Sequence, residues 1–192
     1  MPSTQRIFLA INLPAAERRA IHDATSPLRE AAAGVAWVAE EKLHLTLKFL
    51  GGLPAASVEA LRGALAPALA AAPVPSLAVG GLGAFPDLRA PRVVWLGVEA
   101  DAKLELLHHD IESVCGGLGY EVEGRAFRPH ITLGRARDGV TPAAARALEA
   151  AARGVHHRAR LGAASVEIME SSAAARGSVY RVVASLPLQR GG

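Results

Sequence analysis

One short pattern occurs twice in this chain, and the repetition constrains the fold more than any other feature. The first copy runs from His44 to Leu47 and the second from His130 to Leu133. In both, a histidine and a threonine alternate with two aliphatic residues. Because successive side chains of a strand point to opposite faces, each copy predicts a strand with its polar pair on one face and its aliphatic pair in the core. Two such strands facing each other would form a cleft holding two histidines and two threonines.

The residue types in these motifs suit acid–base chemistry at phosphorus. An imidazole has an ordinary pKa of about 6.5, so one histidine can accept a proton while the other donates one. Threonine hydroxyls can hydrogen-bond phosphate oxygens, and cations with hydroxyls can stabilise the charge without a metal. A single His-x-Thr on a strand would indicate only an edge or partly buried histidine. The second copy favours a catalytic pair.

Composition places the chain among globular proteins. It has 192 residues, of which 51% are hydrophobic and 20% charged, enough for one domain or two small lobes. We find no apolar run that could span a bilayer and no secretion-signal pattern, so we expect a cytoplasmic protein. The only cysteine, Cys115, excludes an internal disulfide and a Cys-rich zinc site. The net charge of +3 allows a polyanionic partner, although abundant Ala, Gly, Arg and Pro would also follow from a GC-rich genome.

Hydrophobic spacing predicts alternating strands and helices in both halves of the chain. Asp101 and Thr141 precede helical segments as candidate N-caps, whereas Pro27 and Pro67 should interrupt or shorten theirs. The expected strands are 6–13, 35–38, 43–50, 77–79, 93–98, 120–122, 127–135, 164–171 and 179–188, and the expected helices are 15–32, 57–69, 101–114 and 143–153. The looser recurrence of this order suggests two related lobes, each with one motif strand.

Together these segments resemble the 2H phosphoesterase superfamily, which is named for its paired His-x-Thr-x motifs. The nearest resemblance is to the bacterial and archaeal RNA 2′,3′-cyclic phosphodiesterases, historically called 2′-5′ RNA ligases. It extends over RIFLAINLP, HLTLKFLG, PRVVWLGV, FRPHITLGR and SVYRVVASLPL, almost the whole chain. The resemblance implies an α+β fold: two pseudo-symmetric lobes with antiparallel sheets around a central cleft and helices outside. Both lobes would belong to one intertwined domain covering residues 1–192.

The resemblance also implies an activity and roles for the motif residues. The activity is hydrolysis of RNA 2′,3′-cyclic phosphate ends to 2′-phosphomonoesters, without a metal or other cofactor, a membrane or an obligate protein partner. By motif position, His44 would donate a proton to the departing O3′ and His130 would accept one from water. Thr46 and Thr132 would bind the phosphate. Arg135, five residues after His130, matches a phosphate-contacting arginine of the family.

Three residues that follow the motifs raise questions of orientation. A regular strand would turn Arg135 away from His130, unless Gly134 introduces a bulge or ends the strand. Lys48 lies an even number of residues after His44 and Thr46, so a regular strand would place it on their face. It is either an RNA-phosphate contact or a solvated lysine. Phe49 has the core parity, which favours packing, but near a strand end it could stack on a base.

Other chemistry-bearing residues receive simpler interpretations. Arg128 and Arg176 are candidates for cations at the rim of the cleft. Trp37 and Trp95 are expected in the core or between the lobes. The adjacent histidines 108–109 and 156–157 are expected at the surface, because neighbours on a helix do not share a face.

Alternative functions remain open at this stage. A module that binds RNA ends without turnover would not need an acid–base pair. A 2′-5′ ligase or 2′-5′ phosphodiesterase would use related chemistry, but no P-loop pattern supports an ATP-driven ligase. A metallohydrolase lacks a recognisable ligand motif. The sequence does not identify the RNA substrate or the oligomeric state.

Overall fold

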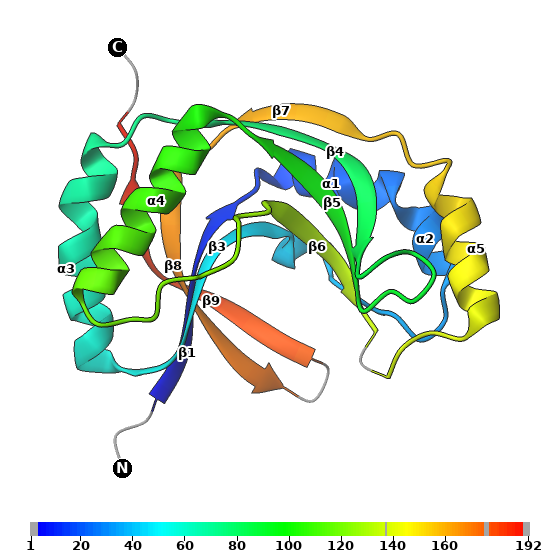
Figure 1. Cartoon of the computed structure of the whole chain (residues 1–192), viewed down its shortest axis with the longest axis horizontal. Coiled ribbons are helices and arrows are strands. Elements are labelled where there is room, and N and C mark those ends of the chain that lie inside the picture. Colours follow the sequence, from blue (N-terminus) through cyan, green and yellow to red (C-terminus); the bar gives the residue numbers. More distant parts are fainter. Residues whose placement is uncertain (1–3, 137, 175–176, 190–192) are drawn as a thin grey trace.

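The computed structural model describes residues 4–136, 138–174 and 177–189, and its strands form one curled antiparallel sheet (Figure 1). The order across the sheet is β7–β4–β5–β6–β3–β1–β8–β9, and β2 also pairs with β6. The strands are β1 Thr4–Asn12, β2 Ala36–Trp37, β3 His44–Pro54, β4 Ser76–Phe85, β5 Val93–Ala100, β6 His130–Arg135, β7 Arg158–Gly162, β8 Ser165–Ala174 and β9 Gly177–Pro187.

Helices lie on both flanks of the sheet. In Figure 1, α3 and α4 lie beside each other on the left, whereas α1, α2 and α5 lie on the right. The helices are α1 Ala15–Ala24, α2 Ser26–Ala31, the short 3₁₀ helix η1 Glu40–Lys42, α3 Ala55–Ala71, α4 Ala102–Gly117 and α5 Pro142–Ala152. This mixed architecture, with antiparallel strands inside and helices outside, confirms the predicted fold class. None of the helices in the described part of the chain has the length and apolarity needed to cross a membrane.

Capping residues begin two of the helices where the sequence predicts. Asp101 Oδ1 accepts a hydrogen bond from the Leu104 amide at 2.8 Å, and Thr141 Oγ1 accepts one from the Ala144 amide at 3.2 Å. Each bond satisfies an amide that has no partner within the first turn of its helix. The expected helix over 15–32 is divided into α1 and α2, with a break at Thr25.

Some predicted boundaries are wrong because packing overrides local preference. Pro67 does not end its helix early: α3 continues to Ala71, and the leucines at 61, 65 and 69 are buried in the core. The predicted strand at 120–122 is irregular, and β7 at 158–162 is not predicted. β4 extends beyond the predicted strand 77–79 and continues through residues 80–85.

The two motif strands lie at the centre of the sheet, which has similar halves on either side of them. β3 is followed by β1, β8 and β9, whereas β6 is followed by β5, β4 and β7. The motif strands are therefore hydrogen-bonded neighbours, and do not face each other from separate sheets as the sequence led us to expect. Leu45 of β3 is the register partner of Ile131 of β6, and both are fully buried.

Candidate active site

The register between β3 and β6 brings both motifs to one surface. Extending the Leu45–Ile131 pair by one residue in each direction places His44 opposite Thr132 and Thr46 opposite His130. All four polar side chains are partly buried, whereas the aliphatic partners are buried. The two histidines are thus diagonal neighbours, a relation that separates Cβ atoms by roughly 7–8 Å in a sheet.

A bulge at the last residue of each motif changes which of the following residues share this surface. On β6, Thr132 and Gly134 pair with consecutive residues of β5, so Leu133 is the extra residue. Gly134 is consequently buried and Arg135 is exposed. A Cβ at Gly134 would lie 2.8 Å from the Trp37 ring, which explains the glycine. The proposed redirection of Arg135 by a bulge is confirmed.

The corresponding bulge on β3 reverses two expectations. Thr46 and Lys48 pair with consecutive residues of β1, so parity changes between them. Phe49 therefore lies on the histidine side of the strand, where 68% of its surface is exposed and its ring centroid is 5.9 Å from that of Phe8. The exposed position of Phe49 contradicts the core packing that the sequence favoured.

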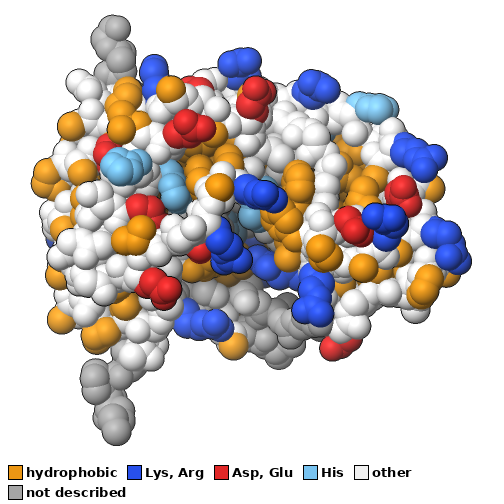
Figure 2. Space-filling model, in the orientation of Figure 1, with side chains coloured by type: hydrophobic (Ala, Val, Ile, Leu, Met, Phe, Trp, Pro, Cys, Tyr) orange, Lys and Arg blue, Asp and Glu red, His pale blue; other side chains and the backbone are white. Residues whose placement is uncertain are grey.

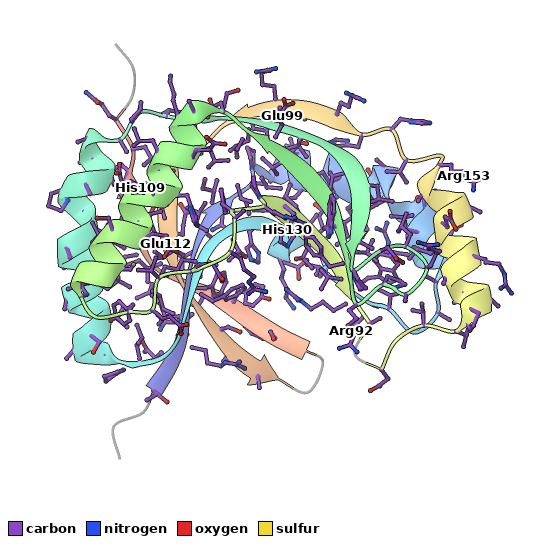
Figure 3. All side chains as sticks on the ribbon, in the orientation of Figure 1. Arg92, Glu99, His109, Glu112, His130 and Arg153 are labelled. Atoms are coloured by element: carbon purple, nitrogen blue, oxygen red, sulfur yellow. The ribbon has the colours of Figure 1, made fainter. Side chains whose placement is uncertain are left out.

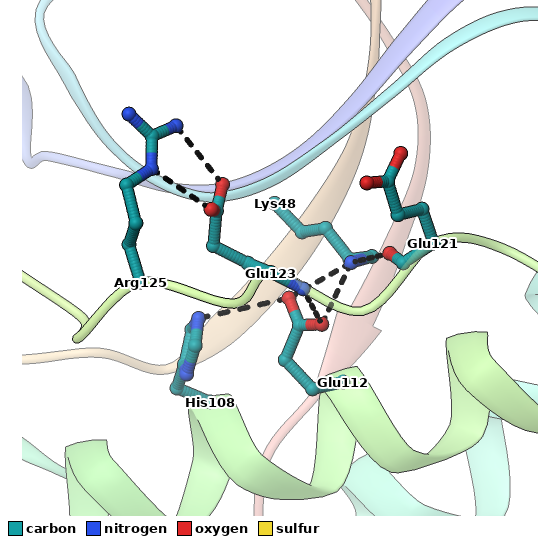
Figure 4. Close-up of polar contacts among 6 residues, drawn as sticks. All are labelled: Lys48, His108, Glu112, Glu121, Glu123 and Arg125. Atoms are coloured by element: carbon teal, nitrogen blue, oxygen red, sulfur yellow. Dashed lines mark hydrogen bonds and ion pairs between the residues drawn. The ribbon is translucent and has the colours of Figure 1, made fainter.

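Lys48 turns the other way, into the protein. Its ammonium group donates to Glu112 Oε1 at 2.9 Å, to Glu112 Oε2 at 2.8 Å and to the Glu121 carbonyl at 2.7 Å (Figure 4). The side chain is only 5% exposed. Because its charge and donors already have protein partners, the structure gives Lys48 a structural setting that differs from both sequence-based interpretations.

Hydrogen bonds fix the orientation of both imidazoles. His44 Nδ1 lies 2.6 Å from the Lys42 carbonyl, and His130 Nδ1 lies 2.8 Å from the Arg128 carbonyl. A carbonyl oxygen only accepts, so each Nδ1 carries the hydrogen. Each Nε2 is then available for proton transfer, and that of His44 lies 3.1 Å from Thr46 Oγ1.

The environment of His44 disfavours its charged form. Burial lowers the pKa of His44 below its ordinary value of 6.5 and the positive charge of Arg135 lowers it further, while the Lys42 carbonyl opposes these effects. The influence of Arg135 on His44 links the end of one motif strand to the start of the other. A bound anion between them would favour the imidazolium.

Aromatic side chains lie next to both histidines. Phe8 and Tyr180 lie 5.2 and 5.4 Å from the ring of His44, measured between centroids. Phe85 and Trp95 lie 5.2 and 6.3 Å from the ring of His130. Sequence reasoning missed Phe8, Tyr180 and Phe85, and it assigned Trp95 only to the core or the space between lobes.

Positive charge surrounds this part of the molecule. Figure 2 shows Lys and Arg side chains around the hollow in the middle of the viewed face, and Figure 3 places His130 in that middle region. Arg128 is exposed and lines a hollow together with His130, in agreement with a rim cation. Arg176 lies outside the described residues.

The remaining candidate residues are structural. Burial raises the pKa of the Cys115 thiol to about 11, so the thiol is protonated at neutral pH. The surface interpretation is wrong for two histidines. His108 stacks on Phe127 with 3.9 Å between ring centroids, and His157 Nε2 lies 2.7 Å from Glu17 Oε1.

Within residues 4–136, 138–174 and 177–189, no three His, Cys, Asp or Glu side chains come together in a cluster that could hold a metal ion.

Comparisons with known proteins point to one family. The model of the 2′-5′ RNA ligase superfamily matches residues 13–171. An RNA 2′,3′-cyclic phosphodiesterase of Geobacillus stearothermophilus is 38% identical over 136 residues, covering 70% of this chain and 43% of that protein. The match therefore spans less than half the length of that relative. A protein of the same name from Thermotoga maritima is 33% identical over 132 residues, covering 69% of this chain and 70% of that protein.

Solved structures extend the similarity to nearly the whole fold. The structure of E. coli LigT complexed with 3′-AMP superposes with a TM-score of 0.75 at 26% sequence identity, covering 96% of this chain and 98% of LigT. A Thermus thermophilus protein superposes with a TM-score of 0.79 at 23% identity, which supports the fold alone.

Proposed function

The chain belongs to the 2′-5′ RNA ligase superfamily, and from this premise we propose that it hydrolyses RNA 2′,3′-cyclic phosphate ends to 2′-phosphomonoesters. The observation that carries the proposal is the juxtaposition of His44 and His130, each with its threonine, on one face of adjacent strands. The curated relatives from Geobacillus and Thermotoga bear the name of this activity.

In the proposed reaction, the two histidines move one proton each. His130 Nε2 accepts a proton from water as the water oxygen bonds to phosphorus. The bond from phosphorus to O3′ breaks on the opposite side, and protonated His44 delivers its Nε2 proton to O3′. The product keeps its phosphate on O2′, and both histidines return to their starting states after proton exchange with solvent.

Fixed donors stabilise the charge on the other phosphate oxygens. The hydroxyls of Thr46 and Thr132 lie beside the histidines on the same face, and Arg135 is redirected to that face by the bulge. Hydroxyl and guanidinium donors placed in advance can stabilise a phosphorane-like charge without a metal. We therefore propose a metal-independent reaction.

Phe49 is proposed to bind the base of the nucleotide that carries the cyclic phosphate. Its exposed ring lies beyond His44 on β3, tilted by 38° against the ring of Phe8. An exposed aromatic face accepts any base, so this contact would position the RNA end without selecting its sequence.

The direct test is incubation of the protein with a short RNA that bears a 2′,3′-cyclic phosphate, in excess EDTA. We expect conversion to a 2′-phosphate, because the residues named above accept one proton, donate the other and supply all charge stabilisation. The position of the phosphate can be identified by ³¹P NMR. A 3′-phosphate product, or a strict requirement for added divalent ions, would contradict the proposed mechanism.

The pKa of His44 provides a second test. We expect an NMR titration of the free protein to give a value below 6.5, because burial and Arg135 disfavour the imidazolium. Adding 2′-AMP should raise this value, since the phosphate dianion favours the charged ring. In a plot of kcat/KM against pH, one of the two slopes should then have its midpoint below pH 6.5. A pKa at or above 6.5 in the free protein, or no response to 2′-AMP, would contradict this picture.

A further inference from the structure

The connecting segment, residues 118–129, leads from the end of α4 directly into the second motif. The structure describes all of these residues, and none of them belongs to a helix or strand. Residues 121–126 are exposed. Figure 4 shows the segment crossing α4, and Figure 3 places the residue that follows it, His130, in the middle of the molecule. Because the segment has no regular hydrogen-bonding partner strand, other contacts must hold it in one position.

The end of the connecting segment orients the imidazole of His130. The Arg128 carbonyl lies 2.8 Å from His130 Nδ1 and thereby leaves Nε2 available for proton transfer. The next carbonyl, that of Pro129, accepts from the Val98 amide of β5 at 3.1 Å. The backbone of His130 is paired with β5 as well. A displacement of Arg128 would therefore weaken the bond that fixes the ring, even if the strand itself stayed in place.

A stack of two rings holds the residue on the other side of Arg128. The Phe127 ring lies against the imidazole of His108 on α4, with 3.9 Å between the ring centroids and 11° between the planes. Both side chains are partly buried. A ring pair of this kind stabilises its arrangement beyond the area that it buries. Arg128 is thus held between two fixed neighbours, Phe127 on α4 and Pro129 on β5.

The helix that carries His108 is a firm support for the stack. One face of α4 is packed into the core through four buried side chains, those of Leu104, Leu107, Ile111 and Cys115. Consecutive residues of a helix point in directions about 100° apart. His108 accordingly lies against the connecting segment, whereas His109, which Figure 3 labels on the same helix, is exposed. The chain therefore provides a matched control beside the residue of interest.

The surroundings of His108 favour an uncharged ring. Burial lowers the pKa of His108 below its ordinary value of 6.5. The carboxylates of Glu112 and Glu123 act in the opposite direction, and the charges of Lys48 and His109 add to the lowering. His108 Nε2 lies 3.8 Å from Glu112 Oε1, but Lys48 already donates to both oxygens of that carboxylate (Figure 4). At pH 7 the ring of His108 therefore acts mainly through its stack on the connecting segment.

We propose that His108 is a positioning residue for the proton-accepting histidine: through Phe127 it holds the Arg128 carbonyl, and through that carbonyl the imidazole of His130. The inference rests on the proposed function, in which His130 Nε2 accepts a proton from water. His108 takes no part in the proton transfer itself. Loss of the stack would let the His130 ring adopt other orientations, so a smaller fraction of the bound complexes would be ready to react.

Kinetics of variants of the stack provide the first test, with a short cyclic-phosphate RNA as substrate. His108→Ala and Phe127→Ala should each lower kcat about tenfold, between the effect of one aromatic contact and the roughly 10²-fold cost of a 1 Å misplacement. KM should change by less than about twofold, because the contacts to the phosphate and the base remain. The double variant should lose about as much as either single one, since both remove the same stack.

Two substitutions on α4 serve as controls. His108→Phe keeps a flat ring against Phe127 and should retain kcat within about twofold. His109→Ala removes the exposed neighbour and should leave both kcat and KM unchanged. A loss in either control as large as that in His108→Ala would overturn positioning by the stack. Phe127→Leu, which keeps apolar volume without a ring, gives the same test as Phe127→Ala if the alanine variant does not fold.

NMR of the free protein reports the orientation of His130 independently of activity. In the unaltered protein, the Nδ1 proton bonded to the Arg128 carbonyl should exchange slowly with solvent in ¹⁵N-edited spectra. We expect faster exchange, and partial transfer of the proton to Nε2, in His108→Ala and Phe127→Ala. A lower Tm together with an unchanged His130 signal and unchanged kcat would show that the stack contributes to stability alone, and would overturn the proposal.

The two measurements separate this inference from the proposed function. If the unaltered protein does not hydrolyse the cyclic phosphate, the proposed function is overturned, yet the Nδ1 signal still shows whether the stack orients His130. If the unaltered protein hydrolyses the substrate and both stack variants keep its kcat, the inference alone is overturned.

Discussion

Replacing either His44 or His130 with alanine is expected to lower kcat/KM for a 2′,3′-cyclic phosphate by roughly 10²–10⁴-fold, the usual contribution of one positioned acid or base. Each Nδ1 is bonded to a carbonyl, so each Nε2 is held ready for transfer. Steady-state kinetics on a short cyclic-phosphate RNA would measure the loss. His156→Ala, at an exposed position, is the matched control and should keep its activity.

The double variant provides a sharper check than either single one. Because the two histidines act on the same transition state, their joint loss should be much smaller than the product of the separate losses. Thr46→Ala and Thr132→Ala each remove one hydrogen bond to a charged group, which is worth about 1.5–3 kcal/mol. Fully multiplicative losses for the histidine pair would argue that they do not cooperate in one step.

A substrate with a better leaving group at the 3′ position distinguishes the acid from the base. It needs less help from a proton donor, so it should restore activity to His44→Ala and leave His130→Ala impaired. Restoration of the His130 variant instead would reverse the assignment of donor and acceptor. An acid must be protonated to act, but the pKa of His44 is lowered in the free protein. The substrate comparison therefore tests directly whether His44 is the proton donor.

Alternation along the strands identified the motif residues but not the shape of the site. A period of two placed His44 and Thr46 on one face, and the structure agrees. The same rule fails beyond each motif, because one extra residue in a bulge exchanges the faces. Lys48 is consequently buried and Phe49 exposed, the reverse of their parity. A bulge depends on how a strand pairs with its neighbours. The sequence of a single strand does not contain this information.

The sequence contains a pattern that could have identified Phe8, one of the aromatic residues near His44. Phe8 and Ala10 alternate with three buried aliphatic residues on β1, so parity alone separates the two faces of that strand. The apolar character of the whole strand concealed this difference. Tyr180 could not be found in this way, because β9 reaches β1 only through β8 in the sheet order. Long-range strand order therefore determines most of the surroundings of the motifs.

The buried pair of Lys48 and Glu112 is expected to be the most sensitive ionic contact for stability. Each side chain is less than a tenth exposed, and the carboxylate also accepts from the Glu123 amide at 3.1 Å (Figure 4). Removing one partner leaves a buried charge without its counterion, which typically costs about 3–5 kcal/mol. Lys48→Met and Glu112→Leu should therefore each lower the free energy of unfolding by that amount, as measured in urea at pH 7.

The double variant Lys48→Met/Glu112→Leu should recover part of this loss, because neither charge is then buried. The exposed pair of Arg62 and Glu59 is the control, and Arg62→Met should change stability by less than about 1 kcal/mol. Glu112 also accepts from the Glu123 amide, in a segment that precedes the second motif strand, so this amide should exchange its hydrogen faster in Glu112→Leu. Single losses as small as that of the surface pair would show that the buried pair does not anchor this segment to β3 and α4.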